Sequence, residues 1–179
     1  MPFEGLADRA MHSLEALKNS VDGTAPAQTE CWDFDVPRFA EGAAGPEIVL
    51  AVDAWANVHY YLYYFELLGN ANVEHIVEEF ALAKAQGRDG RSYSRLNELS
   101  QILYVGGSRS IATRLRQHLG FGARKTYSLH LSHWAQDLGL NLRFYCAGFE
   151  DAQDAEVFQT LEDQLWEEST PMFGRKGRR

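Results

Sequence analysis

The sequence predicts an α/β fold of the α+β kind, in which a small mixed or antiparallel sheet of about three core strands is flanked by helices. Short apolar runs rich in aromatic and β-branched residues lie at 58–67, 103–105 and 140–147, and such runs favour strands. Segments with helical periodicity separate them. A chain of 179 residues is long enough for one domain with a substantial core.

The N-terminal part predicts a helix followed by irregular structure. Residues 3–21 indicate an amphipathic helix that packs on the domain, because their apolar residues recur at close to helical spacing. These residues are Leu6, Met11, Leu14 and Leu17. Glycine and proline interrupt residues 22–46, which leaves room for a short strand at 31–36. We therefore divide the chain into an N-terminal extension, 1–46, and a main domain, 47–179.

Two apolar and β-prone runs follow, at 47–53 and 58–67, and we expect at least one core strand there. Side chains alternate along a strand, so Tyr61, Tyr63 and Phe65 would face one side of the sheet, and the other side would take Tyr60, Leu62 and Tyr64.

The remaining elements follow from periodicity. Residues 72–85 predict a helix, and a basic loop comes after it. Residues 126–138 and 152–168 predict two further helices on either side of the strand at 140–147.

Residues 103–119, LYVGGSRSIATRLRQHL, are the most informative stretch. A short strand ends at Gly106 and Gly107, which allow the backbone to turn, and a serine can cap the helix that follows. Arg114 and His118 are four residues apart and share one face of that helix. With the free N–H groups at the helix start, they predict a phosphate site. A surface helix with scattered basic residues is the alternative.

This stretch resembles the second motif of the GIY-YIG nucleases, in which a strand ending in Tyr-Ile-Gly precedes a helix with an arginine and often a histidine. Tyr104, Val105 and Gly106 stand for the motif. Arg114 follows eight residues after Gly106, and His118 four residues after Arg114, which is the spacing associated with the family.

The family also carries a glutamate on a later helix, followed by a proline and usually an asparagine. Glu162 and Pro171 match these positions, whereas Gly174 stands where asparagine is expected. The Gly-Ile-Tyr sequence of the family's first motif is absent here. The match to a tyrosine before an apolar strand selects Tyr63 for this position, and Tyr61 is the alternative.

The resemblance implies a metal-dependent endonuclease that hydrolyses phosphodiester bonds in DNA. Glu162 would hold Mg²⁺, or another divalent cation such as Mn²⁺. Arg114 would bind phosphate oxygens, which match its planar fork of donors. A phenolate forms more easily beside an arginine, so Tyr63 or Tyr104 would accept a proton. His118 would move a proton or hold the phosphate.

The family joins its first two strands by a short turn, so residues 70–100 would be an inserted helix and a basic loop. The loop either grips a substrate or decorates the surface.

The net charge of −8 is unevenly distributed. Residues 1–85 contain 4 Lys and Arg against 14 Asp and Glu, whereas residues 86–179 contain 13 against 11. A locally basic surface binds phosphates even on an acidic protein. The candidate DNA-binding residues are Arg91, Arg95, Arg109, Arg116, Arg124, Lys125, Arg175 and Lys176.

Other features exclude several alternatives. Cys31 and Cys146 are too few for a disulfide framework or a four-cysteine zinc site. His130 and His133 have no third metal ligand close to them in the sequence. The start of the chain does not resemble a signal peptide, and no run approaches the roughly 18 apolar residues of a membrane span. We expect a cytoplasmic protein without a membrane partner.

Two other functions compete with the nuclease. Gly174 and the missing glycine of the first motif are compatible with a catalytically inactive nucleic-acid-binding module of the same fold. The acidic N-terminal half is compatible with a protein-interaction domain. If the protein is a nuclease with one metal per site, two nicks in duplex DNA favour a homodimer or sequential action.

Overall fold

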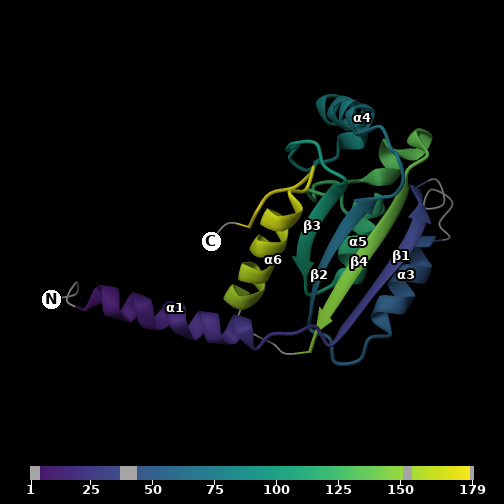
Figure 1. Ribbon diagram of the computed structural model, residues 1–179. Coiled ribbons are helices and arrows are strands. Elements are labelled where there is room, and N and C mark those ends of the chain that lie inside the picture. Colours follow the sequence, from purple (N-terminus) through teal and green to yellow (C-terminus); the bar gives the residue numbers. More distant parts are fainter. Residues whose placement is uncertain (1–4, 37–43, 151–154, 178–179) are drawn as a thin grey trace.

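The computed structural model describes residues 5–36, 44–150 and 155–177. Within these ranges a four-stranded antiparallel sheet has the strand order β1-β4-β2-β3 (Figure 1). The strands are β1 (Gln28–Asp35), β2 (Tyr60–Leu67), β3 (Ile102–Ser108) and β4 (Asn141–Phe149). The α+β class is thereby confirmed, and β3 forms one edge of the sheet.

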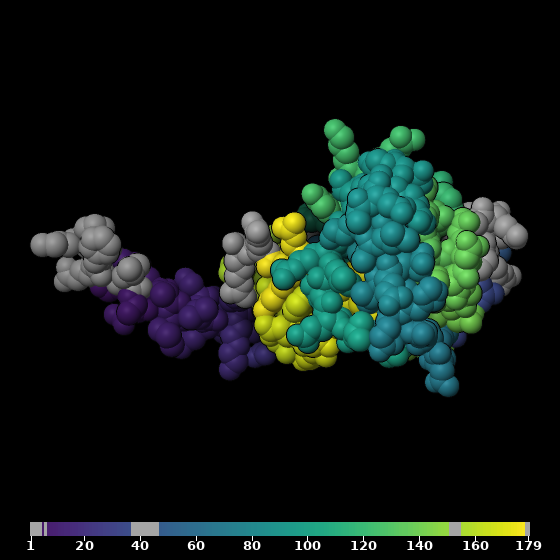
Figure 2. Space-filling view, turned by 90° about the horizontal axis from the view of Figure 1, so that it is seen from above, coloured from purple at the N-terminus to yellow at the C-terminus, as the bar shows by residue number. Residues whose placement is uncertain are grey.

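Helices cover the two faces of the sheet unequally. Two helices, α3 (Ala44–Asp53) and α5 (Ile111–Leu119), lie on one face, and α6 (Ala155–Ser169) lies on the other, against β3 (Figure 1). The remaining helices are α1 (Leu6–Asp22) and α4 (Val73–Ala85). Helix α1 contacts α6 and projects from the body of the molecule (Figure 2). No described helix is both long and apolar enough to cross a membrane.

The alternation predicted for the second strand is confirmed. Tyr63 and Phe65 are buried in the larger core beneath α3 and α5. Leu62 belongs to a smaller cluster on the α6 side, with Phe149 and Phe158. The odd-numbered and even-numbered residues of β2 therefore serve different faces of the sheet.

The expectation of at least one core strand within the runs 47–53 and 58–67 is confirmed by β2, whereas residues 47–53 lie in α3, where Ile48 and Val52 are four residues apart and both buried. One element prediction was wrong in kind. Residues 126–138 do not form a helix, and only the short 3₁₀ turns Leu131–His133 and Gln136–Leu138 occur there. Backbone hydrogen bonds of these short turns and a hydrogen bond from the Trp134 indole to the carbonyl of Leu129 hold this segment.

The predicted number of strands also needs correction, from about three to four in the described part of the chain. The additional strand, β1, pairs with β4 along its whole length. It overlaps the short strand expected at 31–36 and begins earlier, at Gln28, so residues before 47 contribute directly to the sheet.

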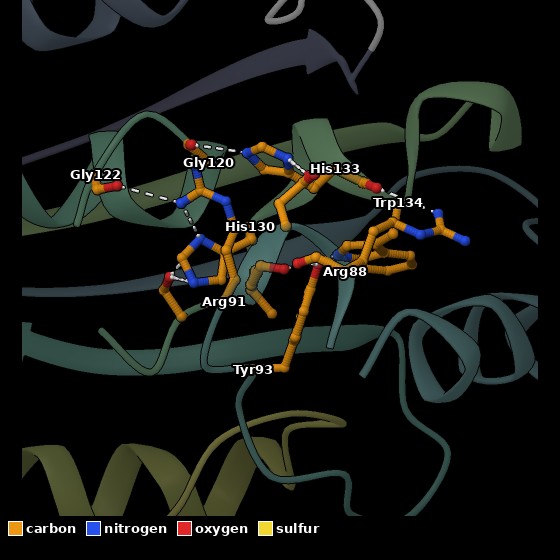
Figure 3. A network of polar contacts seen from close by, with 11 residues as sticks. Arg88, Arg91, Tyr93, Gly120, Gly122, His130, His133 and Trp134 are labelled. Atoms are coloured by element: carbon orange, nitrogen blue, oxygen red, sulfur yellow. Dashed lines mark hydrogen bonds and ion pairs between the residues drawn. The ribbon is translucent and has the colours of Figure 1, made fainter. Parts of the chain in front are cut away.

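The loop after α4 is tied to the loop after α5 by a polar network (Figure 3). Arg88 donates to the carbonyl of His133, and Arg91 donates to the carbonyl of Gly122. His133 also pairs with Asp89 at 2.5 Å. The two loops therefore form one structural unit, and His133 has a role in it that needs no metal.

Candidate active site

Arg114 is the centre of a hydrogen-bonded cluster on the α5 side of β3. Its Nε donates to the hydroxyl of Tyr63 at 3.1 Å, and its Nη2 donates to the hydroxyl of Tyr104 at 2.7 Å. The side chain of Gln117 and the carbonyl of Tyr127 accept further hydrogen bonds from the same guanidinium. Burial opposes the charge of Arg114, but the two phenols more than offset it and its pKa is raised. The cluster thus holds a fixed positive charge.

Tyr63 and His118 form the buried part of this cluster. His118 is fully buried, which lowers its pKa well below the ordinary value, so the ring is neutral. Its Nδ1 accepts from the N–H of Leu129, so its proton lies on Nε2, 3.0 Å from the Tyr63 hydroxyl. Burial also raises the pKa of Tyr63 well above 10. Tyr63 is therefore a protonated phenol held between two N–H donors.

Tyr104 is the more accessible of the two phenols, since its side chain is only partly buried. Its ring lies against Gly174, where a Cβ atom would come within 3.0 Å of the ring carbon Cε2. Gly174 also has φ of +109°, which disfavours other residues. The glycine at the expected asparagine position therefore has a local explanation, because it leaves room for Tyr104.

Glu162 lies on the opposite side of β3, on α6. The N–H of Gly107 and the hydroxyl of Tyr60 donate to its carboxylate. The ring of Tyr60 stacks on Phe158, one helical turn before Glu162, with 4.0 Å between the ring centroids. Burial raises the pKa of Glu162, and the nearby charge of Asp163 adds to this shift. Burial and Glu162 together raise the pKa of Tyr60 to about 12.

Gly106 and Gly107 separate the two halves of the site. A Cβ atom on Gly106 would come within 2.7 Å of the Tyr63 hydroxyl, and one on Gly107 within 2.5 Å of Glu162 Oε2. A side chain at Gly106 would collide with the Arg114 half of the site, at Tyr63, and one at Gly107 with the Glu162 half. Arg114 and Glu162 do not touch, yet the charge of Arg114 acts on the Glu162 carboxylate. The structure does not bring the guanidinium, the phenols and the carboxylate onto one surface: Arg114 lies with Tyr63 and Tyr104 on the α5 side of β3, and Glu162 lies on the α6 side.

A cleft of about 910 Å³ adjoins the Arg114 cluster, and we call it the basic cleft. Tyr127 belongs to both, because it lines the cleft while its carbonyl accepts from Arg114. Asn97 donates to the carbonyls of Pro171 and Gly174, which joins the two walls of the cleft. Its charged lining residues are Lys84, Arg95, Glu98, Arg175 and Lys176.

The predicted DNA-binding residues separate into three groups. Arg95, Arg175 and Lys176 line the basic cleft. Arg91 is partly buried and donates to Gly122, so it supports the loop network (Figure 3). The others are exposed outside the cleft lining, and Arg109 is close enough to Tyr60 to act on its hydroxyl. This last group is Arg109, Arg116, Arg124 and Lys125.

Several residues that form the candidate site and the basic cleft were not identified from the sequence. Tyr60 was placed on the face of the strand away from Tyr63, and its link to Glu162 depends on how α6 packs. Gln117 lies three residues after Arg114, so helical spacing was a usable signal for it. Asn97 and Lys84 lie far from the motifs, and no local pattern indicated them.

The described residues contain no group of three or more His, Cys, Asp and Glu side chains able to hold a metal ion. Asp163, next to Glu162, is buried and accepts hydrogen bonds from Gln159 and from the N–H of Gly177. It therefore anchors the C-terminal segment, and Glu162 is the carboxylate at the glycine pair.

Comparison with known proteins adds no assignment, because no family model, curated protein or solved structure matches this chain.

Proposed function

We propose that this protein is a metal-dependent endonuclease that hydrolyses phosphodiester bonds in DNA and is similar to the GIY-YIG nucleases. The observation that carries the proposal is the arrangement around Gly106 and Gly107. On one side Arg114 is bound to two phenols, and on the other Glu162 is held in a partly dehydrated position. A phosphodiester needs positive charge on its oxygens and a carboxylate-bound cation opposite, and the arrangement supplies a place for both.

The roles of the phenols follow from their burial. Tyr63 is enclosed and its pKa is well above 10, so it is a poor proton acceptor. It orients Arg114, and His118 orients Tyr63, so both are positioning residues. Tyr104 is reachable, and its oxygen receives a charged donor from Arg114 at 2.7 Å. Tyr104 is therefore the better candidate to take a proton from the attacking water.

A divalent cation fits the residues at the glycine pair. Mg²⁺ is commonly bound through one or two carboxylates, with waters and substrate phosphate completing its shell. Glu162 supplies one such carboxylate, and the missing Cβ of Gly107 makes room for its Oε2 and for the Tyr60 hydroxyl beside the strand. When bound, the cation would supply charge stabilisation at the phosphate and a more acidic water. The guanidinium N–H groups of Arg114 would donate hydrogen bonds to the phosphate oxygens that the cation does not bind, and their charge would be balanced in this way.

The test is nicking of supercoiled plasmid DNA with Mg²⁺ or with EDTA. The wild-type protein should nick only with Mg²⁺, and Arg114→Ala and Glu162→Gln should each reduce the rate by about 100-fold or more. Arg143→Ala is the matched control, since Arg143 pairs with Asp33 on β1, the edge strand opposite β3. Nicking that both variants retain at the wild-type rate would refute the site.

An inactive nucleic-acid-binding module is the second candidate, and the extensive engagement of Arg114 with protein acceptors favours it. Salt-dependent DNA binding without cleavage at any divalent cation would support this function over the nuclease.

A further inference from the structure

The basic cleft carries an excess of positive charge, although Lys176 pairs with Glu167 and Lys84 donates to the carbonyl of Ser94. Burial lowers the pKa of Lys84, and the neighbouring charges of Arg175 and Arg95 lower it further. Glu98 is the carboxylate among the lining residues. Three cations held this close favour a ligand with more than one negative charge, such as successive phosphates of a nucleic acid.

The basic cleft also contains a solvent-exposed aromatic ring, that of Tyr127. The side chain of Tyr127 is 62% exposed, and the Arg175 guanidinium carbon lies 5.9 Å from its ring centroid. Tyr127 contacts Arg114 through its carbonyl, so its exposed ring is not part of the Arg114 cluster. Exposed aromatic rings beside cations are typical of sites that bind unpaired bases, which stack on the ring.

The cleft leads to the candidate active site. Its wall includes Tyr127, whose carbonyl accepts from Arg114, and Arg175, which follows the Gly174 that touches Tyr104. A strand lying on the cleft would place its next phosphodiester near Arg114. In a continuous duplex the bases are stacked on one another, so no base is available to stack on the Tyr127 ring.

We propose that the basic cleft binds an unpaired segment of a nucleic acid strand, with phosphates on Lys84, Arg95 and Arg175 and a base stacked on Tyr127. The inference rests on the proposed nuclease function and names its substrate class, which is DNA with a single-stranded region next to the bond that is cut.

The test is fluorescence anisotropy of the full chain in EDTA, with a labelled oligothymidylate and a blunt duplex of the same length. The single strand should bind more tightly. Tyr127→Ala should weaken single-strand binding about tenfold, while Tyr127→Phe keeps it, because stacking needs only the ring. Arg175→Ala should reduce the slope of log K against log salt concentration by about 0.7, the value for one phosphate contact.

Matched controls separate this site from general surface effects. Phe121→Ala removes another exposed ring, and Lys18→Ala removes an exposed cation on α1, and neither residue lines the cleft. Both should bind like wild type. Equal or tighter binding of the duplex, or Tyr127→Ala behaving like Phe121→Ala, would overturn the proposal. EDTA prevents cleavage, so a protein that fails to nick DNA still gives a readable result, and nicking without single-strand preference would refute only this inference.

Discussion

The two sides of strand β3 are built differently although both face the same glycine pair. On the α5 side, Arg114 and His118 hold two phenols in a closed set of hydrogen bonds, and the inner members are fully buried. On the α6 side, Glu162 has two donors and a raised pKa. The first side is a preformed positive charge, and the second is a carboxylate that gains by binding a cation. A site for a metal-bridged phosphate needs this asymmetry.

The largest effect is expected from a change at the boundary between the two sides. Gly107→Ala places a Cβ atom 2.5 Å from Glu162 Oε2 and closer still to the Tyr60 hydroxyl, so Tyr60 and the carboxylate that it holds must move. We expect plasmid nicking to fall by about 100-fold. Gly69→Ala is a control for the loss of a glycine, since nothing lies within 4 Å of its added Cβ. If Gly107→Ala nicks as fast as the control, the carboxylate does not act at the glycine pair.

On the α5 side, His118→Ala should be the most destabilising change. It removes a buried ring and leaves the N–H of Leu129 without its acceptor, at a cost of about 3 kcal/mol. Urea unfolding followed by circular dichroism measures this loss. His75→Ala, on the exposed part of α4, should change the free energy of unfolding by less than about 0.5 kcal/mol. A loss below about 1 kcal/mol for His118→Ala would mean that the cluster is loosely held.

At the edge of the same side, Gly174→Ala tests the packing against Tyr104. The added Cβ lies 3.0 Å from the ring, and φ is +109°, so we expect a loss of about 1–2 kcal/mol and slower nicking. A stable variant with unchanged nicking would show that Tyr104 can move without consequence.

The smallest effect concerns pH. The pKa of Glu162 is raised because burial disfavours its charged form, so the folded state binds this proton more tightly than the unfolded state. Its contribution to stability is fully present below the ordinary value of 4.5 and is lost as pH rises through the folded pKa. Glu162→Gln should therefore raise the melting temperature at about pH 7 and leave it unchanged at about pH 4. A lower melting temperature at pH 7 would contradict the dehydrated carboxylate.

Local spacing predicted the α5 side of the site well. Arg114 and His118 are one helical turn apart, and Tyr104 precedes them in the adjoining strand, so sequence distance sets their relation. The choice of Tyr63 over Tyr61 rests on the match to a tyrosine before an apolar strand, because alternation places both on one face. The role of Tyr63 remains a prediction, although Tyr63 is the one that contacts Arg114.

The parts that sequence could not predict depend on contacts between distant segments. The sequence predicts a short strand at 31–36, but its pairing with β4 along 28–35 depends on a distant segment, and residues 126–138 do not form the helix that their periodicity predicts. The position of Glu162 depends on the stacking of Tyr60 on Phe158 across two elements. The basic cleft joins loops more than 70 residues apart, through Asn97 and Pro171.

The central claim is that both sides of β3 act on one phosphodiester, and a double variant tests it most directly. Plasmid nicking with Mg²⁺ is measured for Arg114→Ala, Glu162→Gln and their combination. Residues that act as a unit are not additive, so the double variant should nick about as slowly as the slower single variant. Losses that multiply in the double variant, or nicking by it at the wild-type rate, would contradict a shared site.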